Sequence, residues 1–186
     1  MKKLPKIFGI LIGLYIVIWL TLANTQAGVL TLQIAAQQNS SLLTRVFTAL
    51  GANPEEAGQD GMSALHFAGY LGADQVIPLL VEKGAPINLR DKEGRTALHI
   101  AAYAGQASAV AILMDQQADS EVKENAGGMT ALHLAVAQKH SETVQVLLEK
   151  GAQPSPEEKS GYTPLFIAEN QDLDDIVELL KKHDAR

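Results

Sequence analysis

The stretch TALHIA at residues 96–101 decides the fold of this chain, because it returns along the sequence at a nearly constant spacing. SALHFA at residues 63–68 comes before it, and TALHLA at residues 130–135 and TPLFIA at residues 163–168 come after it. The four copies begin at Ser63, Thr96, Thr130 and Thr163, so the intervals between them are equal to within one residue. Such a constant period is typical of an array of small units that stack on one another.

The side chains of each copy predict the start of a short helix. The Thr96 hydroxyl can accept a hydrogen bond from the free N–H groups of a first helical turn, and Pro164 has the fixed φ that suits the first helical position. A left-handed residue should end this helix, for which glycine is preferred and asparagine comes next. The expected left-handed positions are Asn39, Gly72, Gly105 and Lys139, and the lysine should strain the backbone by roughly 1 kcal/mol.

A second apolar run follows each copy and predicts a second helix in every unit. The runs occupy residues 76–80, 110–114, 144–148 and 176–180. Gln117 stands at the left-handed end of one of these helices, where other units have glycine. Pro78 should distort its helix slightly, because a proline about one turn from the start removes at most one backbone hydrogen bond. One helix pair cannot bury its apolar face alone, so neighbouring units must stack to form a continuous core.

The repeated pattern resembles the ankyrin repeat, whose period is about 33 residues and whose signature is T-P-L-H-x-A. The resemblance covers residues 61–186 strongly and residues 28–60 weakly, since the first unit has Leu30 and Gln33 in place of the threonine and the histidine. It implies an all-α solenoid of helix-turn-helix units joined by hairpin-like loops. The predicted units are residues 28–60 as a degenerate amino-terminal cap, 61–93, 94–127, 128–160, and 161–186 as a carboxy-terminal cap.

Residues 1–27 differ from the rest of the chain and predict export. Three lysines, at positions 2, 3 and 6, precede an uncharged apolar run from Ile7 to Ala23. We therefore expect an N-terminal hydrophobic leader helix within residues 1–27, either a signal peptide or a signal anchor. The run is longer than the core of an ordinary signal peptide and slightly shorter than the ~20 residues needed to span a bilayer.

Cleavage after Ala27 would fit the small residues Thr25 and Ala27 and would start the mature chain at Gly28, where the first repeat begins. This coincidence favours a cleaved signal. The short basic leader and the lack of cysteine fit a protein of the periplasm of a gram-negative bacterium. The alternative is an inner-membrane anchor that leaves the repeats facing the periplasm. Residues 1–27 would then be the part of the chain that touches the membrane.

Composition agrees with an exported, acidic array. The chain has 15 basic and 21 acidic residues, and removal of the three leader lysines leaves 12 against 21. Such a surface does not bind nucleic acid by releasing counterions, so we expect no nucleic-acid partner. The chain has no cysteine, so an oxidising compartment neither stabilises nor damages it. We expect a monomer.

Three histidines at repeat spacing, His66, His99 and His133, raise the question of a metal site. Stacked helices lie about 8–10 Å apart, whereas histidines that share a zinc ion place their nitrogens about 2 Å from it. We therefore expect no metal and no cofactor. The resemblance implies instead that these histidines tie neighbouring loops together by hydrogen bonds. His140 and His183 have no partners at repeat spacing and are expected to be solvated.

The family resemblance also implies where a partner would bind, at the loop tips and at the ends of the first helices on the concave face. All three tyrosines outside the leader fall at such positions, and tyrosine and methionine are enriched at protein interfaces. The alternative is that the tyrosines pack against neighbouring units. The candidate residues are Met62, Arg95, Met129 and Tyr162 at the tips, and Tyr70, Leu71, Tyr103 and Gln138 on the helices.

These observations predict an exported, non-catalytic module that binds another protein through its concave face. No nucleophile-elbow pattern, phosphate loop or cluster of metal ligands is present in the sequence. The partner is expected to be an envelope enzyme that the chain helps or scaffolds. The alternative is an immunity protein that neutralises a toxin delivered to the periplasm, and the histidines alone motivate a third reading, a hydrolase or metal-binding protein.

Overall fold

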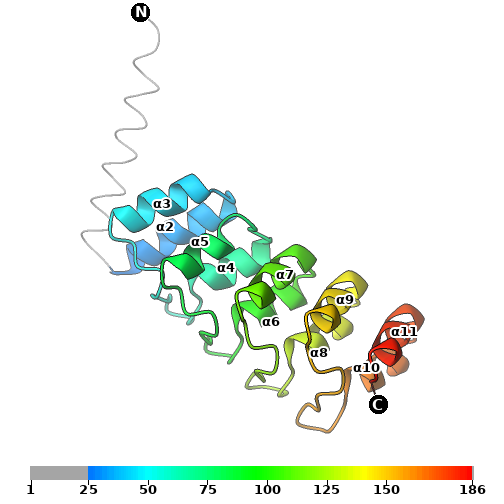
Figure 1. Ribbon diagram of the computed structural model, residues 1–186. Helices are drawn as coiled ribbons and strands as arrows, with labels where there is room; N and C mark the ends of the chain where they lie inside the picture. Colours follow the sequence, from blue (N-terminus) through cyan, green and yellow to red (C-terminus); the bar gives the residue numbers. More distant parts are fainter. Residues whose placement is uncertain (1–24, 186) are drawn as a thin grey trace, which may run out of the picture.

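The computed structural model describes residues 25–185, and this part of the chain contains ten helices and no strand. The helices form five pairs that follow one another along a single stack (Figure 1). The all-α architecture of stacked helix pairs predicted from the repeat is therefore confirmed. The first helices are α2 (Thr25–Gln37), α4 (Ala64–Leu71), α6 (Ala97–Tyr103), α8 (Ala131–Ala137) and α10 (Pro164–Asn170). The second helices are α3 (Ser41–Ala49), α5 (Ile77–Glu82), α7 (Ala107–Asp115), α9 (Ser141–Glu149) and α11 (Asp174–Lys182).

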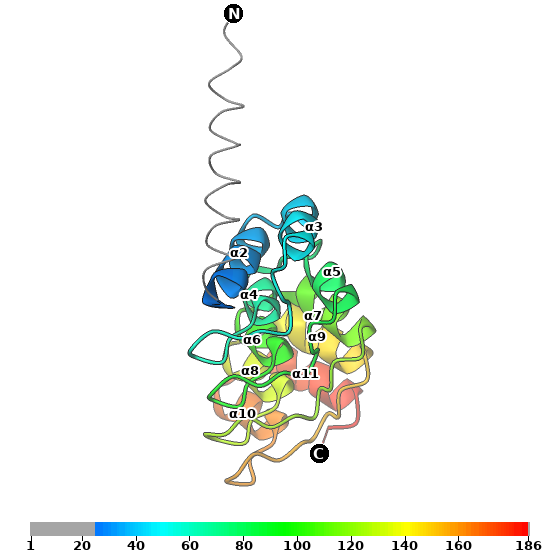
Figure 2. The ribbon, with the colours of Figure 1, turned by 90° about the vertical axis from the view of Figure 1, so that its left-hand side faces the viewer.

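The first helices lie in one layer and the second helices in another, while the loops that join the units extend to one side (Figure 2). We call these loops, at residues 51–63, 84–96, 117–130 and 151–163, the hairpin loops. A backbone hydrogen bond closes each of them, such as the one from the Asp91 N–H to the Arg95 carbonyl (2.9 Å). Neighbouring loops are joined as well, since the Asn125 N–H donates to the Glu93 carbonyl (2.8 Å).

The core is a column of leucines and alanines that repeats with the units. Leu98 of the TALHIA stretch is 1% exposed and Leu113 of the following helix is fully buried. Burying one such side chain contributes about 1.5–3 kcal/mol. Small residues let the helix layers approach closely, and the alanines that end the four copies, Ala68, Ala101, Ala135 and Ala168, are fully buried.

The left-handed helix ends predicted from the sequence are confirmed. Asn39 has φ 44°, Gln117 has φ 66° and Lys139 has φ 64°. Asp172 (φ 55°) takes the same place in the last unit, and the sequence pattern did not predict it. The geometry of the turn is thus kept in every unit, even where a side chain makes the left-handed conformation costly.

Pro78 requires a correction. The sequence predicts it about one turn inside its helix, but α5 begins at Ile77, so Pro78 is the second helical residue. A proline fits the first turn because its missing N–H would have no partner there. The turn before α5 is held by N–H groups of Val76 and Ile77, which both donate to the Ala73 carbonyl (2.9 and 3.1 Å). The helix α5 has 6 residues, against 9 in α7 and in α9, so the unit with the proline has the shorter second helix.

Residues 1–24, which hold most of the expected leader helix, lie outside the described residues. The helix α2 begins at Thr25 and runs through Ala27 and Gly28, the two sides of the expected cleavage point. Within residues 25–185, no helix has the length and apolar character required to cross a bilayer.

Candidate functional site

The three repeated histidines lie at the junctions between units, and each is at most 1% exposed. Every ring donates its Nε2–H to a backbone carbonyl of the next hairpin loop. The Nε2 to oxygen distances are 3.1 Å from His66 to Arg95, 3.2 Å from His99 to Met129 and 3.1 Å from His133 to Tyr162.

The other ring nitrogen caps the histidine's own helix. The Thr96 N–H donates to His99 Nδ1 (3.2 Å), and the same bond joins Thr130 to His133 (3.2 Å) and Ser63 to His66 (3.1 Å). A carbonyl can only accept and a backbone N–H can only donate, so each ring is neutral with its proton on Nε2. Both nitrogens are occupied, which leaves no lone pair for a metal ion. Among residues 25–185, no three residues of the metal-binding types come together.

Burial lowers the pKa of His66, His99 and His133 below the ordinary value of 6.5, because the charged form would lose its hydration. The hydrogen bonds to the backbone carbonyls act in the opposite direction and are the weaker effect. A proton added at Nδ1 would also face a backbone N–H, so protonation breaks the helix cap. The neutral rings are part of the structure of every junction.

Each carbonyl that accepts from a histidine also closes its own hairpin loop. The Met129 carbonyl accepts from His99 and from the Glu124 N–H (3.0 Å), and the Tyr162 carbonyl accepts from His133 and from the Glu158 N–H (3.1 Å). A carbonyl oxygen has two lone pairs, and both are used here. The backbone of the predicted tip residues is therefore fixed, and the side chains project from fixed positions.

An acidic side chain organises the inside of the third hairpin loop. The Glu124 carboxylate accepts N–H groups from Ala126 (2.6 Å), Gly127 (2.6 Å) and Met129 (3.2 Å). Partial burial would raise the pKa of Glu124, but these hydrogen bonds to the charged form outweigh it and lower the pKa. This loop contains the one extra residue of the longest repeat interval, and the carboxylate holds the added turn.

Arg95, a predicted tip residue, is held by its own loop. Its Nε donates to Asp91 Oδ2 (2.8 Å), and a second nitrogen lies 3.2 Å from Glu93 Oε2. The Asp91 side chain is fully buried, so the arginine supplies the charge that this carboxylate needs. Met62 and Met129 are half-buried at their tips, whereas Tyr162 is 49% exposed.

The predicted residues at the ends of the first helices are open to solvent. Tyr70 is 51% exposed, Leu71 41% and Tyr103 49%, and Gln138 is exposed as well. Within the described part of the chain, the hydroxyl groups of Tyr70 and Tyr103 make no hydrogen bond. The structure therefore brings these residues to one surface and leaves about half of each tyrosine uncovered by the neighbouring unit.

The backbone beneath these tyrosines is held by the following unit. Gln106 donates its side-chain N–H to the Tyr70 carbonyl (3.2 Å), and His140 donates Nε2–H to the Tyr103 carbonyl (3.1 Å). The expectation that His140 is solvated is wrong, because the ring is half-buried across the junction. A Cβ on Gly105 would lie 2.7 Å from this ring, so the glycine is needed for space as well as for its positive φ.

Sequence reasoning missed Phe166, which stands in the last copy at the place of the histidine. It is 47% exposed and stacks on Tyr162, with ring centroids 4.5 Å apart and an interplanar angle of 12°. The substitution of phenylalanine for histidine was the available signal. The pair extends the aromatic surface to the last unit.

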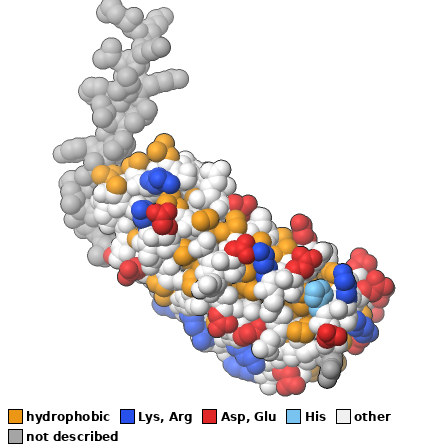
Figure 3. Space-filling view, in the orientation of Figure 1, with side chains coloured by type: hydrophobic (Ala, Val, Ile, Leu, Met, Phe, Trp, Pro, Cys, Tyr) orange, Lys and Arg blue, Asp and Glu red, His pale blue; other side chains and the backbone are white. Residues whose placement is uncertain are grey.

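The face made by the first helices has no charged residue from α2 to α8. We call it the first-helix face. Its larger apolar members that are partly or fully exposed are Leu30, Ile34, Phe67, Tyr70, Leu71, Tyr103 and Leu134, and Gln138 follows the end of α8. Charged side chains lie instead on the hairpin loops, on the second helices and on the turns within the helix pairs, which hold Asp74, Lys139 and Asp172, and α10 carries Glu169. Figure 3 shows acidic and basic side chains interspersed over the side of the molecule that it presents.

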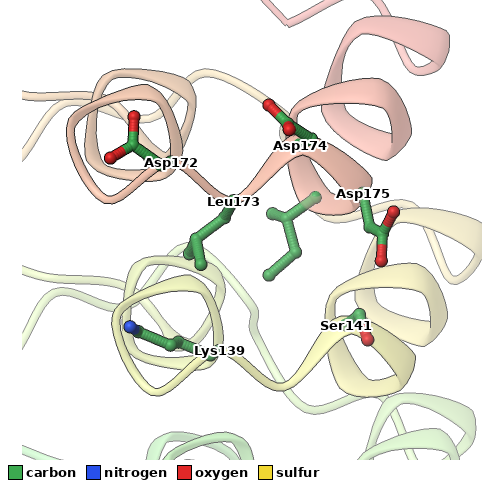
Figure 4. Close-up of a pocket in the computed structure, with 7 residues that line it drawn as sticks. Lys139, Ser141, Asp172, Leu173, Asp174 and Asp175 are labelled. Carbon is green, nitrogen blue, oxygen red and sulfur yellow. The ribbon is translucent and has the colours of Figure 1, made fainter.

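A groove of about 340 Å³ lies between the last two units (Figure 4). Leu173 stands there at the place of Gln106 and His140, and its apolar side chain cannot donate to the preceding helix end. The lining residues are Lys139, Ser141, Asp172, Leu173, Asp174, Asp175 and Ile176. Within the described residues, no hydrogen bond joins Ser141 to Lys139 or to an aspartate, so the groove holds no activated nucleophile.

The comparison with protein families agrees with this geometry. A family model described as ankyrin repeats (3 copies) matches residues 32–124 and 120–186, which together cover most of the chain. A search of curated proteins found no match. The histidine junctions, the paired helices and the family match lead to one conclusion: the chain belongs to the ankyrin-repeat family.

Proposed function

We propose that this chain is a non-catalytic module that binds another protein through the first-helix face and the adjoining hairpin tips. The observation that carries the proposal is the half-exposed Tyr70, Leu71 and Tyr103 on a face without charge. Aromatic side chains bury much apolar area when a partner covers them, and no charge has to lose its hydration in the same contact. Ankyrin repeats commonly serve such interactions.

The rigidity of the junctions supports this proposal. The carbonyls of Tyr70 and Tyr103 are held by the next unit, and those of Met129 and Tyr162 are held by histidines. A surface whose backbone is already ordered loses less conformational entropy on binding. The face is thus prepared for a partner before the partner arrives.

We further propose that the module acts in the periplasm, as a helper or scaffold for an envelope enzyme. The basic start and apolar run of residues 1–23 support export, and the net charge of −6 for the full chain favours a basic partner by electrostatic steering. A toxin that the chain neutralises is the competing partner. The identity of the bound protein separates the two.

The test is affinity capture from the envelope fraction of the native cell, with the tagged full-length chain as bait. A second bait carries Tyr70→Asp and Tyr103→Asp, which place charge on the face. The matched control is Leu42→Asp, because Leu42 is an exposed apolar residue of α3 in the other helix layer (69% exposed). Circular dichroism checks that all three baits are folded.

The expected result is a protein held by the wild type and by Leu42→Asp but lost by the double variant. Titration of the purified pair should then show a loss of affinity of at least roughly tenfold, which corresponds to about 1.4 kcal/mol. Equal binding by the folded double variant would contradict the proposal.

A further inference from the structure

The amino-terminal end of the stack exposes apolar side chains. The helices α2 and α3 form this end (Figure 1), and they carry the two most exposed large apolar side chains of the described residues, Leu42 (69% exposed) and Leu30 (56%). Ile34, one turn after Leu30 on α2, is 38% exposed. The outer face of a terminal repeat meets water and normally has polar residues for solubility. We call Leu30, Ile34, Leu42 and the neighbouring Arg45 the end face.

The place of Leu42 in its unit indicates that its side chain points out of the end of the stack. Ser108 takes the equivalent place on α7, and its hydroxyl donates to Asp74 Oδ1 of the preceding unit (3.1 Å). Within the described residues no repeat precedes the first unit, so the same position is open there. Leucine is found at this position in the first unit alone, since the other units have Gln75, Ser108, Glu142 and Asp175.

Charge separates the first helix pair from the rest of the array. No acidic residue occurs before Glu55, so all 21 acidic residues of the chain follow this pair. The single charged residue between positions 25 and 54 is Arg45, which is exposed and has no ion-pair partner among the described residues. It lies one turn after Leu42 on α3, so the two side chains are neighbours on the helix surface. Apolar side chains beside an unpaired cation complement a partner that is apolar and anionic.

The chain that precedes α2 indicates which partner this is. The uncharged apolar run of residues 7–23 ends two residues before Thr25, where α2 begins. Two steps between Cα atoms span at most about 7.6 Å, so whatever takes up the run lies directly beside the first helix pair. A bilayer takes up apolar runs of nearly this length, and its surface combines acyl chains with lipid phosphates.

We propose that the end face lies on the surface of the bilayer that takes up residues 7–23 in the anchored form of the leader. Leu30 and Leu42 enter the boundary between headgroups and acyl chains, and Arg45 pairs with the phosphates of anionic lipids. The acidic units are repelled by the same surface, so the stack stands on its first unit. The inference goes beyond the proposed function, because the tyrosines of the first-helix face stay free for a protein.

The test places a fluorophore on single residues of the full-length chain, which has no cysteine of its own. The variants Leu42→Cys, Glu55→Cys and Asp175→Cys are labelled with the environment-sensitive fluorophore NBD and reconstituted into vesicles of phosphatidylethanolamine and phosphatidylglycerol. Lipids with a spin label near the headgroup quench a fluorophore that enters the boundary. Asp175 is the matched control, at the place of Leu42 in the last unit. Glu55 controls for the tether, because it belongs to the first unit but reaches Gly84 of the next one.

The label at position 42 should lose fluorescence and shift to the blue, while the labels at positions 55 and 175 should do neither. Adding Arg45→Glu to the Leu42→Cys chain should reduce the quenching in these vesicles. Absence of quenching at position 42, or equal quenching at all three positions, would overturn the inference, and so would unchanged quenching with Arg45→Glu. Native protein that begins at Gly28 would overturn it as well. None of these outcomes bears on the proposed function, which the Tyr70 and Tyr103 variants test separately.

Discussion

At the scale of single residues, Thr143 is the exception in an otherwise satisfied core. It is 1% exposed, and its hydroxyl is the buried side-chain polar atom without a hydrogen-bond partner among the described residues. The equivalent positions of neighbouring units hold Val76, Ala109 and Ile176, which are all apolar. A buried hydroxyl without a partner destabilises the folded state, because it has lost its bond to water.

The substitution Thr143→Val should therefore raise the free energy of unfolding by about 1 kcal/mol, since it keeps the shape and removes the hydroxyl. Thr130→Val is the matched control, because the Thr130 hydroxyl lies 3.0 Å from His133 Nδ1 and caps α8. That change should lower stability by about 1 kcal/mol. Urea unfolding measures both, and a loss of stability in Thr143→Val would show that the hydroxyl has a partner after all.

At the scale of elements, the junction between two units depends on an uncharged histidine. The folded state lowers the pKa of His66, His99 and His133, so at mildly acidic pH the unfolded chain binds more protons than the folded chain. The stability of the junctions is complete above pH 6.5, the ordinary pKa, and is lost as the pH falls below it. Charged groups of both signs face the rings: Asp60, Asp91 and Arg95 near His66, Glu124 and Arg90 near His99, and Glu158 and Lys123 near His133.

Urea unfolding at several pH values should show this loss directly. The free energy of unfolding should fall between about pH 7 and pH 5, by up to ~1.4 kcal/mol per pH unit for each histidine. His99→Gln removes one titrating ring and should reduce the slope by up to a third. An unchanged free energy over this range in the wild type would mean that the rings take up protons equally in the folded and unfolded chains, so that burial does not lower their pKa.

The sequence predicted the local features of these elements and missed the contacts across them. Left-handed helix ends at Asn39, Gln117 and Lys139 could be predicted because a turn is determined by residues next to it in the chain. The hydrogen bonds of Gln106 and His140 were missed because each joins residues 36 or 37 positions apart. Those contacts depend on how the units are stacked. The start of α5 was misplaced because Pro78 could be counted as an interior residue as easily as a first-turn residue.

At the scale of the whole molecule, the repeat period was enough to predict the architecture. It predicted only some of the residues that form the candidate face. Tyr70 and Tyr103 are exposed at equivalent places, but Arg95 is held by Asp91, and Phe166 was not foreseen. Periodicity places a side chain on a surface. It does not reveal whether a neighbour from another unit neutralises that side chain.

The leader provides a prediction for the whole chain. If the signal is cleaved after Ala27, the intact mass of the protein isolated from native envelope should correspond to a chain that begins at Gly28. This cut would also remove the first three residues of α2, which should not unfold the unit, because its buried residues Val29 and Leu32 remain. A mass that includes residues 1–27 would instead support the anchored form.

The histidine junctions have a consequence for how this array can change over time. Each ring donates to the backbone carbonyl of a tip residue, so the hydrogen bond does not depend on which side chain that tip residue has. Arginine, methionine and tyrosine already occupy the three positions held in this way. Substitutions of the side chains at these tips therefore leave the hydrogen bonds between the units intact. Separating the fixed backbone from the exchangeable side chain would allow one architecture to acquire new specificities by single substitutions.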